Sequence, residues 1–166
     1  MKQRNGLLVD TCALIAFVNR SDPHHAETVA YIETAIRDGV PLYLSALTVA
    51  EFCNRQSMQS VDQTVFIVEG FEAPEAVLAG KMDASIERDQ GDDRVSLKVD
   101  VMLIAHAEKL GLNAILTRDR QLAKYCDRLR HVGLTVVQPI LTTDPFVPAK
   151  VHDAAVQGLL APPPLH

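Results

Sequence analysis

The sequence predicts an α/β fold in which helices cover both faces of a central, mainly parallel sheet of about five strands. Short apolar runs alternate along the chain with longer segments whose apolar residues recur every three or four positions. The short runs are apolar throughout, which is typical of strands that are buried on both faces of a sheet. With 166 residues, 48% of them hydrophobic, the chain is large enough for one such core.

The N-terminal part of the chain predicts three strands and three helices. An apolar run at 6–9 ends at Asp10, and apolar residues at helical spacing then continue over 11–18. A second helix begins near Pro23, a residue that suits the first helical turn, and ends at Gly39, which suits a helix C-terminus. The remaining elements of this part are a strand at 42–44, a helix at 48–58 and a strand at 65–68.

The C-terminal part continues the same alternation. Pro74 opens a helix in which apolar residues recur up to Ile86, and polar residues form a loop at 89–94. The next helix is expected to begin at Asp100 and to end at Gly111. The last elements are a strand at 114–116, a helix at 120–126 and a strand at 134–137.

The pattern of strands and helices fades after Pro139. We therefore expect a domain at 1–138 and a C-terminal tail at 139–166. Residues 161–164 read Ala-Pro-Pro-Pro and predict that the tail is partly flexible. The sequence leaves open a second arrangement, in which residues 139–166 pack on the domain or on a partner.

Composition excludes several classes of protein. The chain has 16 basic and 21 acidic residues, so a broadly basic surface for nucleic acid is excluded, whereas a small basic rim or bound cations could still hold phosphate. No apolar run approaches the length of a membrane helix, so no membrane association is expected. The three cysteines are far apart, which suits free thiols in the reducing cytoplasm.

Four acidic residues stand where predicted strands end or helices begin. Asp10 follows the first strand, Glu51 is expected in the first turn of the helix after the second strand, and Asp119 follows the fourth. Asp100 opens a helix. Because strand C-termini and the helix N-termini that follow them line one edge of a parallel sheet, we expect the four side chains to meet there.

Each acid alone fits a simpler interpretation, a helix N-cap, and the segment Thr48–Glu51 has the spacing of a capping box. Four converging carboxylates repel one another, however, and such a cluster is usually stabilised by a divalent cation. Oxygen ligands favour Mg²⁺ or Mn²⁺ over zinc. Because such a cation activates water and offsets charge at phosphorus, the pattern predicts phosphodiester hydrolysis by metal-activated water.

Short motifs around these acids resemble, in order and spacing, those of PIN-domain proteins, and among them the single-domain toxins of the VapC type. The similarity covers roughly residues 5–137. The matching segments are Val9–Thr11, Asp22–His25, Thr48–Phe52, Lys98–Ala107 and Leu116–Asp119.

The resemblance implies a three-layer α/β/α PIN-like fold, with residues 1–138 as the nuclease domain. It further implies a Mg²⁺- or Mn²⁺-dependent endoribonuclease that is the toxin of a type II toxin–antitoxin pair, with structured RNA such as transfer RNA as substrate, a small antitoxin as partner and a homodimer. Thr11 and Thr117 match hydroxyl residues that orient the neighbouring acids or contact phosphate. The residues that match the catalytic and metal-binding acids are Asp10, Glu51, Asp100 and Asp119.

Basic residues and histidines near the motifs complete the expected site. Arg118 and Arg120 flank Asp119, and we expect both to contact phosphate, because an acidic protein that binds RNA needs local positive charge. His24 and His25 fit a surface turn better than a metal site, since no other histidine stands at a ligand spacing.

Two other functions fit parts of the pattern. An aspartate-dependent phosphatase needs a D-x-D motif after the first strand, but the second acid is replaced by Cys12. A non-catalytic PIN-fold binding module would keep the fold and lack metal-dependent cleavage. The presence of all four acids favours the enzyme.

Overall fold

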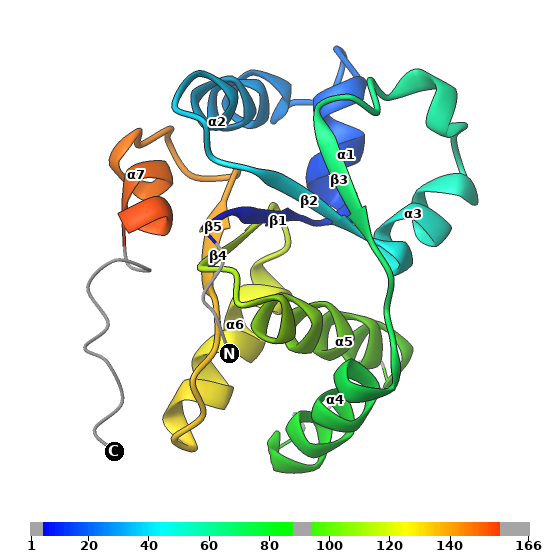
Figure 1. Ribbon diagram of the computed structural model, residues 1–166, viewed down its shortest axis with the longest axis vertical. Helices are drawn as coiled ribbons and strands as arrows, with labels where there is room; N and C mark the ends of the chain where they lie inside the picture. The colour runs from blue at the N-terminus through cyan, green and yellow to red at the C-terminus, as the bar shows by residue number, and fades with distance from the viewer. Residues whose placement is uncertain (1–4, 88–93, 157–166) are drawn as a thin grey trace.

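Five parallel strands form the centre of the protein in a computed structural model that describes residues 5–87 and 94–156. The strand order is β3-β2-β1-β4-β5, and every neighbouring pair is parallel. Helices lie on both faces of the sheet (Figure 1). The structure thus confirms the predicted three-layer α/β/α class and the parallel sheet.

The elements follow one another in the alternation that the sequence predicts. The strands are β1 (Leu7–Val9), β2 (Leu42–Ser45), β3 (Phe66–Glu69), β4 (Ala114–Thr117) and β5 (Gln138–Leu141). The helices are α1 (Thr11–Val18), α2 (His25–Arg37), α3 (Ala46–Cys53), α4 (Ala73–Ser85), α5 (Arg94–Leu110), α6 (Arg120–His131) and α7 (Ala149–Val156), with a 3-10 turn η1 (Met58–Ser60). Within the described residues, no helix is both long and apolar enough to span a membrane.

Alternate residues of each central strand point to opposite faces of the sheet. In β1, Leu7 and Val9 are buried in the core beneath α1 and α2, whereas Leu8 is buried in the core beneath α5 and α6. Figure 1 shows α1, α2 and α7 on one side of the sheet and α4, α5 and α6 on the other. Burial on both faces explains why the strands read as continuous apolar runs.

The order in which the chain adds strands to the sheet changes side at the boundary between the neighbouring strands β1 and β4. It proceeds from β1 to β2 and β3 on one side, and then continues with β4 and β5 on the other side of β1. The carboxyl ends of β1 and β4 are adjacent, and Asp10 N donates to Leu116 O at 2.9 Å. Such a switch point is where open α/β sheets usually bind ligands.

Two helices begin earlier than the sequence predicts. Helix α3 begins at Ala46, because Ser45 at the end of β2 caps it directly, with Ser45 Oγ accepting from Leu47 N at 3.1 Å. The expected capping box at Thr48–Glu51 is therefore wrong, and the helix also ends at Cys53 rather than at residue 58. Helix α5 already spans Arg94, so Asp100 lies in its second turn and does not open it.

The last strand lies four residues later than predicted. Helix α6 continues to His131 because Leu129 extends its buried face, so the expected strand at 134–137 is wrong and β5 occupies Gln138–Leu141. Pro139 is tolerated there because β5 is an edge strand. The sheet thus extends past residue 138 into the segment expected to be a tail.

Part of the segment at 139–166 packs on the domain. Val151 in α7 is fully buried in the core beneath α2, and the Phe146 ring meets the Tyr31 ring edge-on at 4.8 Å. The Tyr31 hydroxyl also accepts a hydrogen bond from Val147 N at 3.1 Å. Residues 161–164, expected to be flexible, lie outside the described residues.

Candidate active site

All four predicted acids line one pocket of about 270 Å³ at the carboxyl edge of the sheet. They come from four separate segments: the start of α1, the second turn of α3, the second turn of α5 and the start of α6. The structure therefore brings the predicted side chains together, although two of them reach the pocket from within helices. The acids are Asp10, Glu51, Asp100 and Asp119.

Asp10 is the most tightly held of the four acids. It is the N-cap residue of α1, and its Oδ1 accepts from Thr11 N at 2.6 Å. Its Oδ2 accepts from Thr117 Oγ1 at 2.7 Å and from Cys12 Sγ at 2.8 Å. Burial raises the pKa of Asp10, and these hydrogen bonds only partly oppose that rise. The orientation of this carboxylate is thus set by groups from both β4 and α1.

Thr117 positions two of the acids from beneath the pocket. Its hydroxyl donates to Asp10 and accepts from Asp119 N at 2.9 Å. Asp119 in turn caps α6, with Oδ1 accepting from Gln121 N at 2.7 Å. Because Thr117 is fully buried and outside the pocket lining, its side chain orients these acids and does not reach a ligand in the pocket.

Thr11 links the first acid of the site to the second. Its Oγ1 donates to Glu51 Oε2 at 2.6 Å, while its backbone N–H donates to Asp10. Glu51 is exposed on α3 and faces the pocket one helical turn before Arg55. Thr11 thus contacts both acids and also lines the pocket, a position from which the orienting role expected of it is possible.

The environment of Asp100 also disfavours a negative charge. Burial, followed by the charges of Asp119, Asp10 and Glu51, raises the pKa of Asp100 to about 8. Its Oδ2 is buried and has no hydrogen-bond partner. An unsatisfied buried carboxylate oxygen is costly, so Asp100 would gain most from a cation in the pocket.

The donor set fits Mg²⁺ or Mn²⁺ held in part by water. Among the described residues, no three His, Cys, Asp or Glu side chains are grouped closely enough to form a complete metal cage. Mg²⁺ does not need one, because it usually binds one or two carboxylates and keeps several waters. The orphaned oxygen of Asp100, in a pocket that four carboxylates line, is the feature of this structure that matches such a cation.

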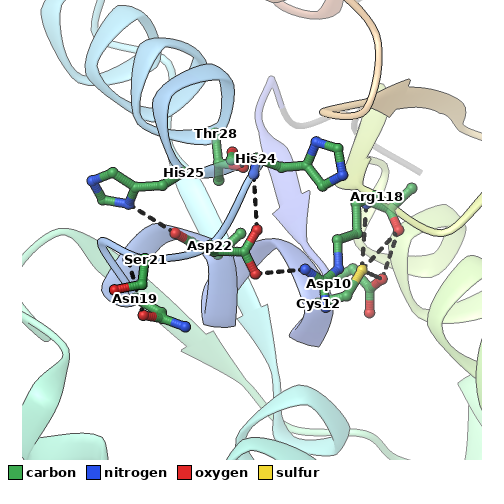
Figure 2. A network of polar contacts seen from close by, with 11 residues as sticks. Asp10, Cys12, Asn19, Ser21, Asp22, His24, His25, Thr28 and Arg118 are labelled. Carbon is green, nitrogen blue, oxygen red and sulfur yellow. Dashed lines mark hydrogen bonds and ion pairs between the residues drawn. The ribbon is translucent and has the colours of Figure 1, made fainter.

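Only one of the two arginines predicted for the site reaches it. Arg118 lines the pocket, and its guanidinium Nη1 donates to Asp22 Oδ2 at 2.6 Å (Figure 2). Arg120 is exposed and pairs with Asp144 at 2.8 Å, outside the pocket lining, and its predicted phosphate contact stays a prediction.

Other residues of the lining were missed by sequence reasoning. Arg55 contributes a cation to the rim, and its position four residues after Glu51 was the available signal. Ser96 and Leu103 face the pocket with Asp100 because they lie on the same side of α5. The predicted start of that helix at Asp100 concealed this face.

Cys12 occupies the position where a phosphatase would carry its second aspartate. The Cys12 thiol lines the pocket and donates to Asp10, and burial and the Asp10 charge raise its pKa well above the usual range. It is therefore a protonated hydrogen-bond donor, and no D-x-D pair is present. His106 lies away from the pocket: it is fully buried, with Nδ1 2.8 Å from Ser45 Oγ.

Comparisons with known proteins agree with this architecture. The family model described as PIN domain matches residues 7–128. No curated protein matches the chain. Among solved structures, Mycobacterium tuberculosis VapC20, a sarcin-ricin loop cleaving toxin, has a TM-score of 0.53 at 18% identity, covering 81% of this chain and 100% of its own.

Two VapBC structures are similar in the same way. VapBC2 from Rickettsia felis, bound to a promoter DNA fragment, has a TM-score of 0.52 at 11% identity, covering 80% of this chain and 97% of that chain. DNA-bound VapBC from Salmonella typhimurium has a TM-score of 0.52 at 15% identity, and the match covers 82% of this chain and 98% of that chain. These likenesses show the shared fold, while the family match spans most of the chain and includes all four acids of the pocket. The protein therefore belongs to the PIN-domain family.

Proposed function

We propose that this protein is a Mg²⁺- or Mn²⁺-dependent endoribonuclease of the VapC type, the toxin of a type II toxin–antitoxin pair. The observation that carries the proposal is the convergence of four carboxylates on one pocket, with a buried, unpartnered oxygen on Asp100. Membership of the PIN-domain family and the similarity of the fold to VapC20 and two VapBC structures support it.

The residues of the pocket have separable tasks. Asp10, Asp100, Glu51 and Asp119 would hold the cation, one or two of them directly and the others through its bound waters. When bound, the cation supplies an activated water and offsets charge that develops on the phosphate. Thr117 and Thr11 keep the carboxylates in place through the hydrogen bonds described above. The protonated Cys12 thiol fixes Asp10 Oδ2 without adding a negative charge.

The charge of the protein is compatible with RNA once the site is considered separately. Without the four pocket acids, the chain has 17 acidic and 16 basic residues, so much of its excess negative charge is in the pocket. Arg118 and Arg55 provide positive charge at the rim, where the phosphates beside the cut would lie.

The proposed substrate is structured RNA. Transfer RNA is one target class, and the sarcin-ricin loop that VapC20 cleaves is a second one to test. The proposed partners are a small antitoxin protein and a second copy of this chain, and the proposed location is the cytoplasm. The antitoxin-bound neighbours support the first partner.

The experiment that tests the proposal is cleavage of defined RNAs by the purified chain with Mg²⁺, Mn²⁺ or EDTA. We expect cleavage with either cation and none with EDTA. A single 2′-deoxy substitution at the cut should not block cleavage, because water attacks phosphorus and the neighbouring 2′-hydroxyl is not required.

Variants complete this test. Asp10→Asn and Asp100→Asn should each reduce the rate by at least ~100-fold, because each removes a charged group on which the reaction depends. Asp127→Asn is the matched control, since Asp127 is exposed on α6 and pairs with Arg130 outside the pocket. Cleavage that survives EDTA, or that is equal in Asp100→Asn and wild type, would refute the proposed function.

A further inference from the structure

The Arg118 side chain joins the pocket to a turn that precedes α2. Its Nη1 lies 2.6 Å from Asp22 Oδ2, and the Asp22 side chain is only 7% exposed, against 33% for Arg118. Figure 2 shows this pair between the turn at Asn19–His25 and the cluster of Asp10 and Cys12. Asp22 is outside the pocket lining, and within the described part of the chain its side chain is joined to the pocket by the bond to Arg118.

The turn holds Asp22 in a fixed orientation. Asp22 Oδ1 accepts from His24 N at 2.9 Å, Asp22 N donates to Asn19 O at 2.9 Å, and His25 N donates to Asp22 O at 3.0 Å. Burial alone would raise the pKa of Asp22, but the His24 backbone N–H and the Arg118 guanidinium lower it overall. A carboxylate anion therefore stands at a set position beside the rim.

The backbone of Arg118 is fixed as well. Arg118 N donates to Cys12 Sγ at 3.3 Å, and the residues on either side of it are Thr117 and Asp119, which are held by the hydrogen bonds of the site. Both ends of the arginine side chain are thus anchored. Within residues 5–87 and 94–156, Nη1 is the one guanidinium nitrogen of Arg118 that has a hydrogen-bond partner. The other N–H groups remain available to a ligand.

The pocket carboxylates are alternative ion-pair partners for the Arg118 guanidinium. Released from Asp22, the Arg118 guanidinium would be attracted toward Asp10 and Asp119, where it would occupy the oxygens that a divalent cation needs. The ion pair with Asp22 holds the guanidinium at the rim instead. From there, its remaining N–H groups can form a bidentate contact with a phosphate.

We propose that Asp22 is a positioning residue for the substrate: it holds Arg118 away from the pocket carboxylates and directs it at an RNA phosphate next to the cut. This inference rests on the proposed ribonuclease function and adds a residue that lies outside the pocket. A purely structural role for Asp22, in stabilising the turn, is the alternative that the test must separate.

Asp22→Asn separates the two roles because an asparagine keeps the turn. Its side-chain oxygen can still accept from His24 N, whereas the negative charge that holds Arg118 is lost. The comparison variants are Arg118→Ala, Arg118→Lys and the double variant Asp22→Asn/Arg118→Ala. Asp38→Asn is the matched control, because Asp38 forms a 3.0 Å pair with Arg37 at the end of α2, away from the site.

The measurements are RNA affinity in EDTA as a function of salt concentration, and KM and kcat in Mn²⁺. Asp22→Asn and Arg118→Ala should each weaken affinity about tenfold, the usual effect of losing one charged hydrogen bond. Each should also reduce the slope of log affinity against log salt by about one, as expected for one lost phosphate contact. Arg118→Lys should recover part of the affinity.

The double variant decides the mechanism. If Asp22 acts through Arg118, then adding Asp22→Asn to Arg118→Ala changes affinity by less than about twofold. Independent, multiplying effects, or an Asp22→Asn variant with wild-type affinity and salt slope, would overturn the inference. If the wild type binds RNA but does not cleave it with Mg²⁺ or Mn²⁺, the proposed function fails. The affinity data then still test whether Asp22 positions Arg118 for RNA binding. If the wild type does not bind RNA at all, both proposals fail.

Discussion

The Thr117 hydroxyl donates to Asp10 Oδ2 at 2.7 Å and so joins two residues that are 107 positions apart in the sequence. Thr117 Oγ1 also accepts from Asp119 N at 2.9 Å. One buried hydroxyl thus orients an acid on each side of the switch point between β1 and β4. This contact explains why a threonine, and not a larger apolar residue, ends β4 at the pocket.

Replacing Thr117 with valine should therefore reduce cleavage while leaving the fold intact. Valine has nearly the same shape but cannot donate to Asp10, and losing such a supporting hydrogen bond typically costs about 10–100-fold in metal affinity or activity. Thr117→Ser should retain most of the rate. The measurement is the cleavage rate across a range of Mn²⁺ concentrations.

Thr142 provides a matched control for that substitution. It lies just beyond β5, its backbone N–H donates to Thr117 O, and its fully buried Oγ1 has no hydrogen-bond partner. Thr142→Val should leave cleavage unchanged and stability equal or higher, since it removes an unsatisfied hydroxyl. Equal losses in the two valine variants would argue against a specific role for Thr117.

The stability of the protein in EDTA should fall as pH rises, because burial raises the pKa of three acids, Asp100, Asp10 and Glu108, of which Asp100 lies in the pocket with a pKa of about 8. The pKa of Asp100 is about 8 in the folded chain, against about 4 when unfolded. Between these values the folded state binds the extra proton, so the contribution of this group is fully present below about pH 4 and is lost as pH rises through 8. Urea unfolding at pH 5, 7 and 8.5 measures this slope.

Asp100→Asn should flatten this pH dependence, and it should be more stable than the wild type at pH 8.5 without a cation. Added Mg²⁺ should stabilise the wild type at that pH, because a ligand that binds the native state raises its stability, and should have little effect on Asp100→Asn. A steep pH dependence that persists in the variant would show that other groups are responsible.

The rim arginines should differ in their importance. Arg55→Ala should raise KM for RNA several-fold, with kcat less affected, because Arg55 lines the pocket and would meet a flanking phosphate. Arg120→Ala should have a smaller effect, since Arg120 pairs with Asp144 outside the pocket. Steady-state kinetics of the two variants at equal ionic strength compares them. A larger loss for Arg120 would mean that RNA crosses the outer face of α6.

Residues beyond 138 should contribute to the stability of the domain. Val151→Ala should lower the free energy of unfolding by about 2 kcal/mol, because Val151 is fully buried in the core. Val132→Ala is the control, since Val132 is 53% exposed and its truncation removes little buried surface. Chemical denaturation gives both values, and an equally small loss for Val151 would indicate that α7 is only loosely attached.

Local patterns were sufficient to predict the fold class and the position of the site. The apolar runs at β1, β2 and β4 reveal buried parallel strands, and Gly39 and Gly111, with φ of 67° and 70°, follow α2 and α5 as the sequence predicts. The acids that directly follow strands, Asp10 and Asp119, were placed correctly because strand ends and caps are encoded locally.

The features that the sequence did not predict depend on tertiary contacts. Asp100 reads as a helix start by composition, but the burial of Leu97 and Val101 against the sheet extends α5 in front of it. Arg118 and Arg120 are equivalent by sequence spacing, and only the position of Asp22, 96 residues from Arg118, distinguishes them. Such pairings require the fold before they can be predicted.

Cation binding at the pocket carboxylates is the most direct measurement of the proposed chemistry. Mn²⁺ titration of the wild type, Asp10→Asn, Asp100→Asn and the Asp127→Asn control can be followed by calorimetry and, in parallel, by RNA cleavage. We expect saturable binding in the wild type and in Asp127→Asn, with the cleavage rate rising over the same concentrations, and loss of both in Asp10→Asn and Asp100→Asn. Wild-type Mn²⁺ affinity in Asp100→Asn, or cleavage that does not follow Mn²⁺ binding, would contradict the assignment of this pocket as a metal-dependent nuclease centre.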